Sequence, residues 1–204
     1  GAAVPLSDAF AALTQTHPQL EAFVQRFASL PVRNAGTLGG NIANGSPIGD
    51  SMPLLLALDA QLVLASVHGQ RTLALSAFYT GYRQTALAAD EVLVRITHTG
   101  VCHTDGEWLR VYKISKRLED DISAVCLALN LRLADGVVQQ VRIGAGGVAA
   151  TPVRAYQTET QLRGQAWSEA SVQQAITTLR AELRPITYKR ASGSYRTEVI
   201  GNQQ

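Results

Sequence analysis

Residues 33–50 read RNAGTLGGNIANGSPIGD, and they hold five glycines and three asparagines in eighteen positions. Glycine adopts backbone conformations with φ > 0 and lets a ligand approach the main chain closely. A loop with many free backbone N–H groups suits a ligand with phosphates and a polar ring edge. The plain alternative is a solvated connection, because Gly, Asn and Ser clusters commonly mark turns. The segment therefore predicts a long loop, either ligand-binding or merely connecting.

Helices and strands occur in mixed order on both sides of this loop. Apolar spacing and N-cap residues predict helices at residues 9–13, 19–30, 53–58, 154–162 and 168–183. Alternating patterns predict strands at residues 61–66, 71–75, 91–97, 108–113, 130–133 and 137–143. The Asp135-Gly136 pair between the last two strands is a hairpin signal. This mixture favours an α+β fold over a doubly wound parallel sheet.

Composition narrows the class of protein. The chain has 204 residues, 46% hydrophobic and 17% charged, so it can bury the core of one large or two small domains. A net charge of +2 argues against nucleic acid or an anionic membrane as the main partner. No apolar run approaches the roughly 20 residues of a membrane helix, and no export signal is visible. Two cysteines make no disulfide framework, so we expect a cytoplasmic protein.

An ordered series of short motifs runs through most of the chain. The series comprises Ser29, Val32-Arg33-Asn34, Thr37-Leu38-Gly39-Gly40-Asn41, Ser46-Pro47, Asp50, Gly81-Tyr82-Arg83, Tyr112-Lys113, Lys116-Arg117, Asp120-Asp121-Ile122, Gly146-Gly147-Val148-Ala149 and Tyr195-Arg196. It resembles the FAD-binding subunit or domain of molybdenum hydroxylases, in particular the C-terminal part of the small subunit of bacterial xanthine dehydrogenases. The resemblance implies a partial FAD-binding subdomain, the flavin-ring side, over residues 1–100. It implies a C-terminal flavoprotein subdomain, a three-stranded antiparallel sheet with helices, over residues 101–204.

The resemblance also implies which residues contact FAD. Those residues are Phe27, Thr37, Gly39, Gly40, Asn41, Asn44, Ser46, Asp50, Leu93 and Lys113. Main-chain N–H groups of the two glycines would reach the pyrophosphate or ribityl oxygens, and Asp50 would accept from a sugar hydroxyl or a flavin N–H. A cation at Lys113 would stabilise the reduced, anionic flavin. The alternatives are a core contact between Phe27 and Phe23, and a solvated lysine at a strand end.

A charged run that includes Arg117 and Asp120 precedes an apolar stretch. The resemblance implies that these residues lie at the mouth through which NAD⁺ reaches the flavin. The residues themselves also fit a helix N-terminus with acidic groups in its first turn. The two interpretations are compatible.

The implied function is electron relay within a xanthine dehydrogenase-like oxidoreductase. Electrons would pass from iron–sulfur clusters through FAD to NAD, and the iron–sulfur and molybdenum-cofactor parts would be partner domains or subunits. The sequence opens without Met inside an apolar run, so we expect a chain truncated at its N-terminus. We therefore expect it to lack the Gly-Gly-Thr-Asp-like loop of that family. FAD bound without that loop would be held weakly or not at all.

Residues 97–105, THTGVCHTD, depart from the family pattern. They resemble the zinc-binding segment of medium-chain alcohol dehydrogenases, and Cys102, His103 and His98 are the candidate ligands. No Gly-His-Glu and no four-cysteine lobe accompany them, so the site prediction contains no metal. A zinc-dependent activity at Cys102, an exposed polar loop and a non-catalytic, cofactor-free remnant remain alternatives.

Overall fold

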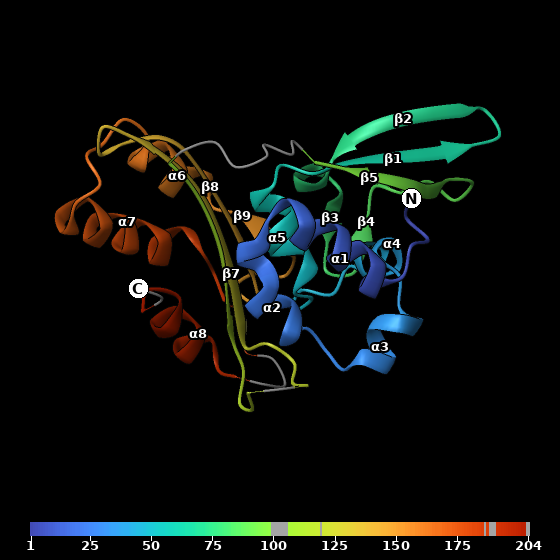
Figure 1. Ribbon diagram of the computed structural model, residues 1–204, viewed down its shortest axis with the longest axis horizontal. Coiled ribbons are helices and arrows are strands. Elements are labelled where there is room, and N and C mark those ends of the chain that lie inside the picture. Colours follow the sequence, from blue (N-terminus) through green and yellow to red (C-terminus); the bar gives the residue numbers. More distant parts are fainter. Residues whose placement is uncertain (99–105, 119, 186, 188–190, 203–204) are drawn as a thin grey trace.

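The computed structural model describes residues 1–98, 106–118, 120–185, 187 and 191–202. It is a mixed α+β structure with antiparallel sheets, as the sequence predicts. Figure 1 shows a helical N-terminal region beside a long curved sheet, with further helices on the sheet's far side. None of the described helices is long and apolar enough to cross a membrane.

The N-terminal region begins with short helices. These are α1 Leu6–Thr16, the 3₁₀ helix η1 Pro18–Leu20, α2 Glu21–Gln25, α3 Leu30–Ala35, α4 Leu38–Ala43 and α5 Ser51–Ala57. The helix predicted over residues 19–30 is therefore η1 and α2, and it ends early. The chain turns after α2, where Ala28 has φ 50°. The Arg33 guanidinium stabilises this turn by donating to the carbonyl oxygen of Phe27 at 2.9 Å.

The long loop predicted over residues 33–50 is wrong in its first half, because it contains the end of α3 and all of α4. Thr37 is the N-cap of α4, and its hydroxyl accepts a hydrogen bond from the Gly40 N–H at 3.0 Å. Two glycines inside a helix cost stability, which is why the sequence favoured a loop here. The cap and the packing of the buried Leu38 and Ile42 offset that cost.

A small sheet and a short strand pair follow. The sheet has the order β2-β1-β5 and is built from β1 Gln61–Ser66, β2 Gly69–Ala74 and β5 Val92–Thr97. Between β2 and β5 lie the 3₁₀ helix η2 Leu75–Ala77 and the pair β3 Tyr79–Gly81 and β4 Gln84–Thr85. The β1–β2 hairpin extends away from the rest of the molecule in Figure 1.

The second sheet has the antiparallel order β6-β7-β8-β9. Its strands are β6 Glu107–Ile114, β7 Val125–Ala134, β8 Val137–Gly146 and β9 Val153–Arg154, so a short fourth strand joins the three expected. Helices α6 Tyr156–Leu162, α7 Glu169–Glu182 and α8 Gly193–Ile200 follow. The sequence prediction missed α8, whose N-cap Ser192 accepts from the Tyr195 N–H at 3.2 Å.

Strand β8 continues through the glycines that were expected to end it. A Cβ added to Gly144 would clash with the carbonyl oxygen of Pro53 in α5. These small residues therefore let α5, all of whose residues are buried, lie directly on the sheet. The Gly144–Gly147 stretch thus serves helix–sheet packing.

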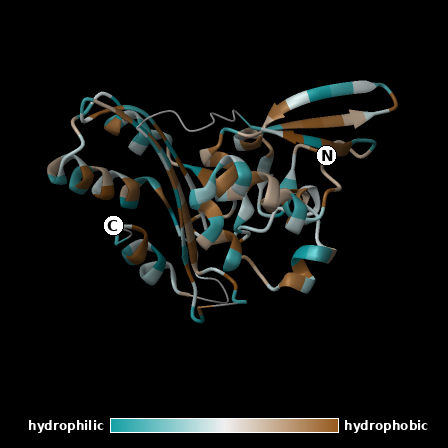
Figure 2. Cartoon of the chain, viewed as in Figure 1, coloured by the Kyte–Doolittle hydropathy of each residue, from teal (hydrophilic) through white to brown (hydrophobic). Residues whose placement is uncertain are grey.

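The second sheet is a wall shared by two hydrophobic cores. On one face, Leu109 and Cys126 belong to the first core, with α1, α2 and α5. On the other face, Val125 and Leu127 belong to the second core, with α6, α7 and α8. Successive strand residues point to opposite faces, so adjacent residues of β7 serve different cores. Figure 2 accordingly shows β7 as largely hydrophobic, whereas the exposed strand β2 is more hydrophilic.

Candidate functional site

A buried ion pair joins the start of α5 to the end of β6. The Lys113 ammonium lies 2.5 Å from Oδ2 of Asp50, and the two side chains are 3% and 8% exposed. Asp50 occupies the N-cap position of α5, yet its side chain makes no capping hydrogen bond. It turns to Lys113 instead, because β6 places the lysine on the face of the sheet that α5 covers. Structure thus brings together two residues 63 positions apart that the resemblance had assigned to one site.

The second oxygen of Asp50 is open. Oδ1 is buried and has no hydrogen-bond partner among the described residues. An unsatisfied buried acceptor of this kind calls for an explanation, since most such atoms are bonded. A ligand N–H or hydroxyl would satisfy it.

Side chains around α4 and α5 hold the adjoining loop in place. The Ser51 hydroxyl donates to Oδ1 of Asn41 at 2.5 Å, and the Arg83 guanidinium donates to Oδ1 of Asn44 at 3.1 Å. The Tyr79 hydroxyl donates to the carbonyl oxygen of Ile42 at 3.0 Å, and burial raises the pKa of that hydroxyl. The side-chain oxygens of both predicted asparagines therefore already have protein partners.

The loop also contacts the second sheet. The Ser46 hydroxyl accepts from the Ile48 N–H at 3.4 Å, and the carbonyl oxygen of Pro47 accepts from the Gly147 N–H at 2.7 Å. These bonds position the residues just before Asp50.

The predicted glycines and Thr37 have structural partners. The Gly39 N–H donates to the carbonyl oxygen of Ala2 at 2.9 Å, and a Cβ at Gly39 would lie 2.6 Å from the Ala2 Cβ. The Gly40 N–H donates to Thr37, as described above. Their assignment to FAD remains a prediction, and the close approach seen at Gly39 is to the chain's own N-terminal segment.

Phe27 and Leu93 lie in the first core. Phe27 makes edge-on contacts with Phe10 and Phe23, at centroid distances of 4.7 and 5.8 Å. This is the core contact that the sequence left as an alternative. Leu93 is partly buried on β5 and pairs with Leu64 of β1. A flavin contact of either side chain remains a prediction.

Arg117 and Asp120 lie in the segment between β6 and β7. The Arg117 side chain is exposed, and its guanidinium lies 3.6 Å from the buried carboxylate of Asp121, which also accepts the Arg117 N–H at 3.0 Å. Asp120 is exposed and has φ 49°. The arrangement holds a turn at the surface, and the NAD role stays a prediction.

Two further buried residues of the second sheet and its surroundings were not predicted as site residues. Cys126 pairs with Lys113 across the strands, and its sulfur lies 3.9 Å from the carbonyl oxygen of Asp50. Burial, reinforced by Asp50, raises the pKa of this thiol. Arg196, 1% exposed, donates to the carbonyl oxygens of Ala124 and Gly147. Only its place in the motif series could have singled out Arg196.

The metal candidates are tested only in part, since Cys102 and His103 lie outside the described residues. His98 is described, and its Nδ1 is buried without a hydrogen-bond partner among the described residues. Its ring lies 5.9 Å from that of His17, and burial, together with His17, lowers the pKa of His98. Within the described part of the chain, no three His, Cys, Asp or Glu side chains form a group that could hold a metal ion.

The residues beside Asp50 fit the polar part of a flavin. A buried cation and an open carboxylate oxygen match a ring with an electron-rich edge and an N–H or hydroxyl donor. Both charges are held where solvent screening is weak, so each interaction with a ligand would be strong.

Two family models match the chain in succession. Residues 1–97 match the FAD binding domain in molybdopterin dehydrogenase, and residues 110–203 match the CO dehydrogenase flavoprotein C-terminal domain. The chain is 37% identical to the xanthine dehydrogenase/oxidase of Gallus gallus over 162 residues, which cover 77% of this chain and 12% of that protein. It is 32% identical to the carbon monoxide dehydrogenase medium chain of Hydrogenophaga pseudoflava, over 90% of this chain and 63% of that one.

Solved structures agree in fold. Carbon monoxide dehydrogenase from Hydrogenophaga pseudoflava superposes with a TM-score of 0.91 at 30% identity, over 99% of this chain and 70% of that one. Quinoline 2-oxidoreductase from Pseudomonas putida 86 superposes with a TM-score of 0.84 at 27% identity, with the same coverage. These findings confirm the resemblance drawn from the motif series. The chain belongs to the family of FAD-binding subunits and domains of the molybdenum hydroxylases, which includes those of xanthine dehydrogenase and carbon monoxide dehydrogenase.

Proposed function

We propose that this chain supplies the flavin-ring side of the FAD site in a xanthine dehydrogenase-like oxidoreductase. Electrons would arrive from iron–sulfur clusters and leave to NAD⁺. The observation that carries the proposal is the buried Lys113–Asp50 pair with its open Oδ1. Bound FAD would supply the redox chemistry, which none of these side chains provides.

Each residue of the pair has a separate role. Lys113 holds a positive charge in a poorly solvated place and favours added negative charge on a neighbouring ligand. Asp50 fixes the position of the ammonium through Oδ2 and keeps Oδ1 free to accept a hydrogen bond. The packing of α5 on the second sheet holds the two side chains next to each other. We propose that the other predicted FAD residues contact the same bound FAD.

Partners and acceptor belong to the same proposal. The carbon monoxide dehydrogenase relative is a medium chain, one subunit of a larger enzyme, and the xanthine dehydrogenase relatives are much longer proteins. We infer that an iron–sulfur part and a molybdenum-cofactor part act with this chain. We assign Arg117 and Asp120 to the NAD⁺ entrance because both are exposed on the segment that follows the β6 strand of Lys113.

Titration with FAD tests the proposal directly. We expect the purified chain, or a form extended at its N-terminus, to bind one FAD per chain with quenching of flavin fluorescence. Asp50→Asn removes the negative charge and, with its one oxygen accepting from Lys113, puts an NH2 group in the place of the open oxygen; this should weaken binding by about tenfold, the equivalent of 1.4 kcal/mol. Asp90→Asn, an exposed carboxylate away from the pair, is the matched control and should bind as the parent does.

Loss of binding in both chain lengths would end the proposal. If the chain then still unfolds cooperatively, the non-catalytic alternative is favoured. The acceptor is tested separately by mixing FAD-loaded protein with NADH and following flavin bleaching. An Arg117→Ala/Asp120→Asn variant should slow bleaching without changing FAD affinity, and an unchanged rate would remove the NAD assignment.

A further inference from the structure

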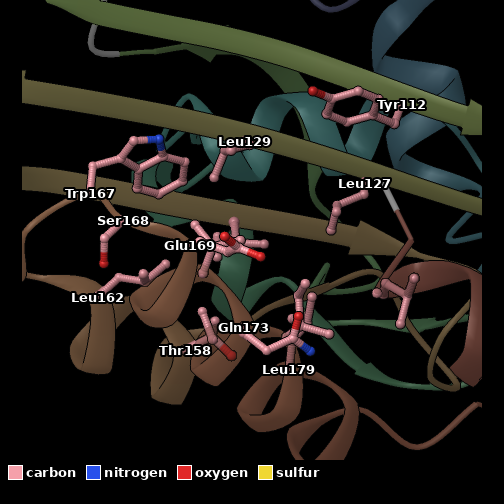
Figure 3. Close-up of a pocket in the computed structure, with 16 residues that line it drawn as sticks. Tyr112, Leu127, Leu129, Thr158, Leu162, Trp167, Ser168, Glu169, Gln173 and Leu179 are labelled. Carbon is pink, nitrogen blue, oxygen red and sulfur yellow. The ribbon is translucent and has the colours of Figure 1, made fainter. Parts of the chain in front are cut away.

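A second cavity lies on the opposite face of the shared sheet. Its volume is about 530 Å³, and it is bounded by β6, β7 and β8 on one side and by α6, α7 and α8 on the other. Figure 3 shows strand residues such as Leu127 and Leu129 facing helix residues such as Leu162 and Leu179 across it. Its strand residues belong to the core on that face, so the cavity is separate from the Lys113–Asp50 pair on the other face.

The size of this cavity is that of a ligand site. The cavity is partly open to solvent and is not an enclosed void. Pockets that hold small organic molecules range from about 300 to 1,000 Å³ and are lined mainly by apolar and aromatic side chains. Here Leu127, Ile143 and Ile176 supply apolar walls, and Tyr112 and Trp167 supply rings. The lining therefore favours a ligand with an extended apolar or aromatic body.

Two polar side chains on α7 set the chemistry of the remaining part. Glu169 and Gln173 lie one turn apart on the helix and both line the cavity. Both residues are exposed at the rim of the cavity, and neither side-chain head group has a hydrogen bond or ion pair within the part of the chain that the structure describes. Glu169 accepts hydrogen bonds and carries negative charge, and Trp167 close by in sequence offers a ring face to a cation.

We propose that this cavity binds an aromatic amine, with its ring between the sheet and α7 and its nitrogen facing Glu169. An N–H or ammonium group matches the unpaired carboxylate, whereas an aromatic carboxylate would be repelled by it. The site does not depend on FAD, since its strand residues point to the face of the sheet opposite the Lys113–Asp50 pair.

Fluorescent amines test the site on the full chain. N-phenyl-1-naphthylamine, which has one N–H and brightens in apolar surroundings, should bind saturably with one molecule per chain. Val172→Phe fills the cavity and should weaken binding by about tenfold or more. The matched control is Gln174→Phe, which adds the same ring to an exposed, non-lining position of α7 and should leave binding unchanged.

Charge is tested with 1-naphthylmethylammonium against 1-naphthoate. Glu169→Gln should weaken the cation several-fold and leave the neutral amine nearly unchanged, and the parent should prefer the cation to the anion. The chain has two tryptophans, so in a Trp108→Phe background the bound naphthyl group should quench Trp167 directly. Quenching of Trp167 can still be measured if Val172→Phe does not fold. Non-saturable binding, equal effects of both phenylalanine variants, or no quenching of Trp167 would overturn the proposal.

Discussion

Two groups of charges connect the ends of α5 to the C-terminal half, and they use their oxygen atoms differently. At the C-terminal end, Glu159 is 1% exposed and accepts from the Ile143 N–H at 2.8 Å and from Arg154 through both oxygens, at 2.8 and 3.0 Å. Arg154 also reaches Asp59 at 2.7 Å. At the N-terminal end, Asp50 uses one oxygen for Lys113 and leaves the other open.

The difference separates a structural carboxylate from one with binding capacity. Glu159 has each oxygen occupied by the protein, so its network ties β8, β9 and α6 together and has nothing left for a ligand. Asp50 is as well buried as a structural acid, yet it is incompletely bonded. A buried acceptor left open costs stability, and a ligand that fills it recovers that cost.

The largest effect is expected from Lys113→Met, which leaves the Asp50 carboxylate buried without a counter-charge. We expect the free energy of unfolding to fall by about 3–5 kcal/mol, as for other broken buried pairs. Urea unfolding measures the change. The double variant Asp50→Asn/Lys113→Met removes both charges and should regain much of the loss; a single variant as stable as the parent would show that the pair is not buried in solution.

Glu159→Gln should have the next largest effect and should separate the two sites. The amide keeps one acceptor but loses the charge opposite Arg154, which should cost about 2 kcal/mol, within the range for hydrogen bonds to charged groups. FAD affinity, measured by fluorescence titration, should not change. A variant that binds FAD tenfold more weakly would contradict the division between structural and binding carboxylates.

His98 offers a smaller, pH-dependent test, because it too has a buried atom with no hydrogen-bond partner in the described part of the chain. Burial, together with His17, lowers the pKa of His98 from its usual 6.5, so the unfolded chain takes up a proton more readily than the folded one. The contribution of His98 is therefore complete above pH 6.5 and is lost as the pH falls. His98→Gln should flatten the stability curve below pH 6.5, while Asp50→Asn should leave this part of the curve in place.

The surface pair of an exposed Arg71 and a partly buried Glu91 should give the smallest change. Nε of Arg71 lies 2.6 Å from Oε1 of Glu91, and the hydrogen bond from Arg71 lowers the pKa of Glu91 to about 2. The sign is that of a carboxylate: its contribution is present above pH 4.5 and is lost as the pH falls toward 2. Solvent screens such pairs, so Glu91→Gln should barely move the urea midpoint at pH 7. A loss like that of Lys113→Met would show that exposure does not distinguish the two pairs.

The members of the ion pair could be predicted from the sequence, but its geometry could not. Asp50 and Lys113 were assigned to one site through the motif series, and the structure brings them together. The open Oδ1 depends on where α5 lies against β6, which no local pattern encodes. Likewise, the spacing of Phe23 and Phe27 predicts their contact, whereas the contact with Phe10 depends on how α1 packs.

Local rules failed where tertiary contacts outweighed propensity. Gly39 and Gly40 argued for a loop, yet the Thr37 cap and the buried Leu38 fix a helix there. The C-terminal segment looks polar, but Arg196 is buried because three carbonyl oxygens, of Ala124, Gly147 and Ala191, accept from its guanidinium. Segments 61–66 and 108–113 were close to the observed β1 and β6 because strand alternation is a local property.

The position of β7 between the two cores has a consequence for the cooperativity of unfolding. Because its alternate residues complete two different cores, neither core can lose its order while the strand stays native. We expect a single unfolding transition and the slowest amide hydrogen exchange at residues 125–131, which are buried or nearly so. An isolated fragment of residues 106–202 would expose Leu109 and Cys126 on one face, and we expect it to aggregate.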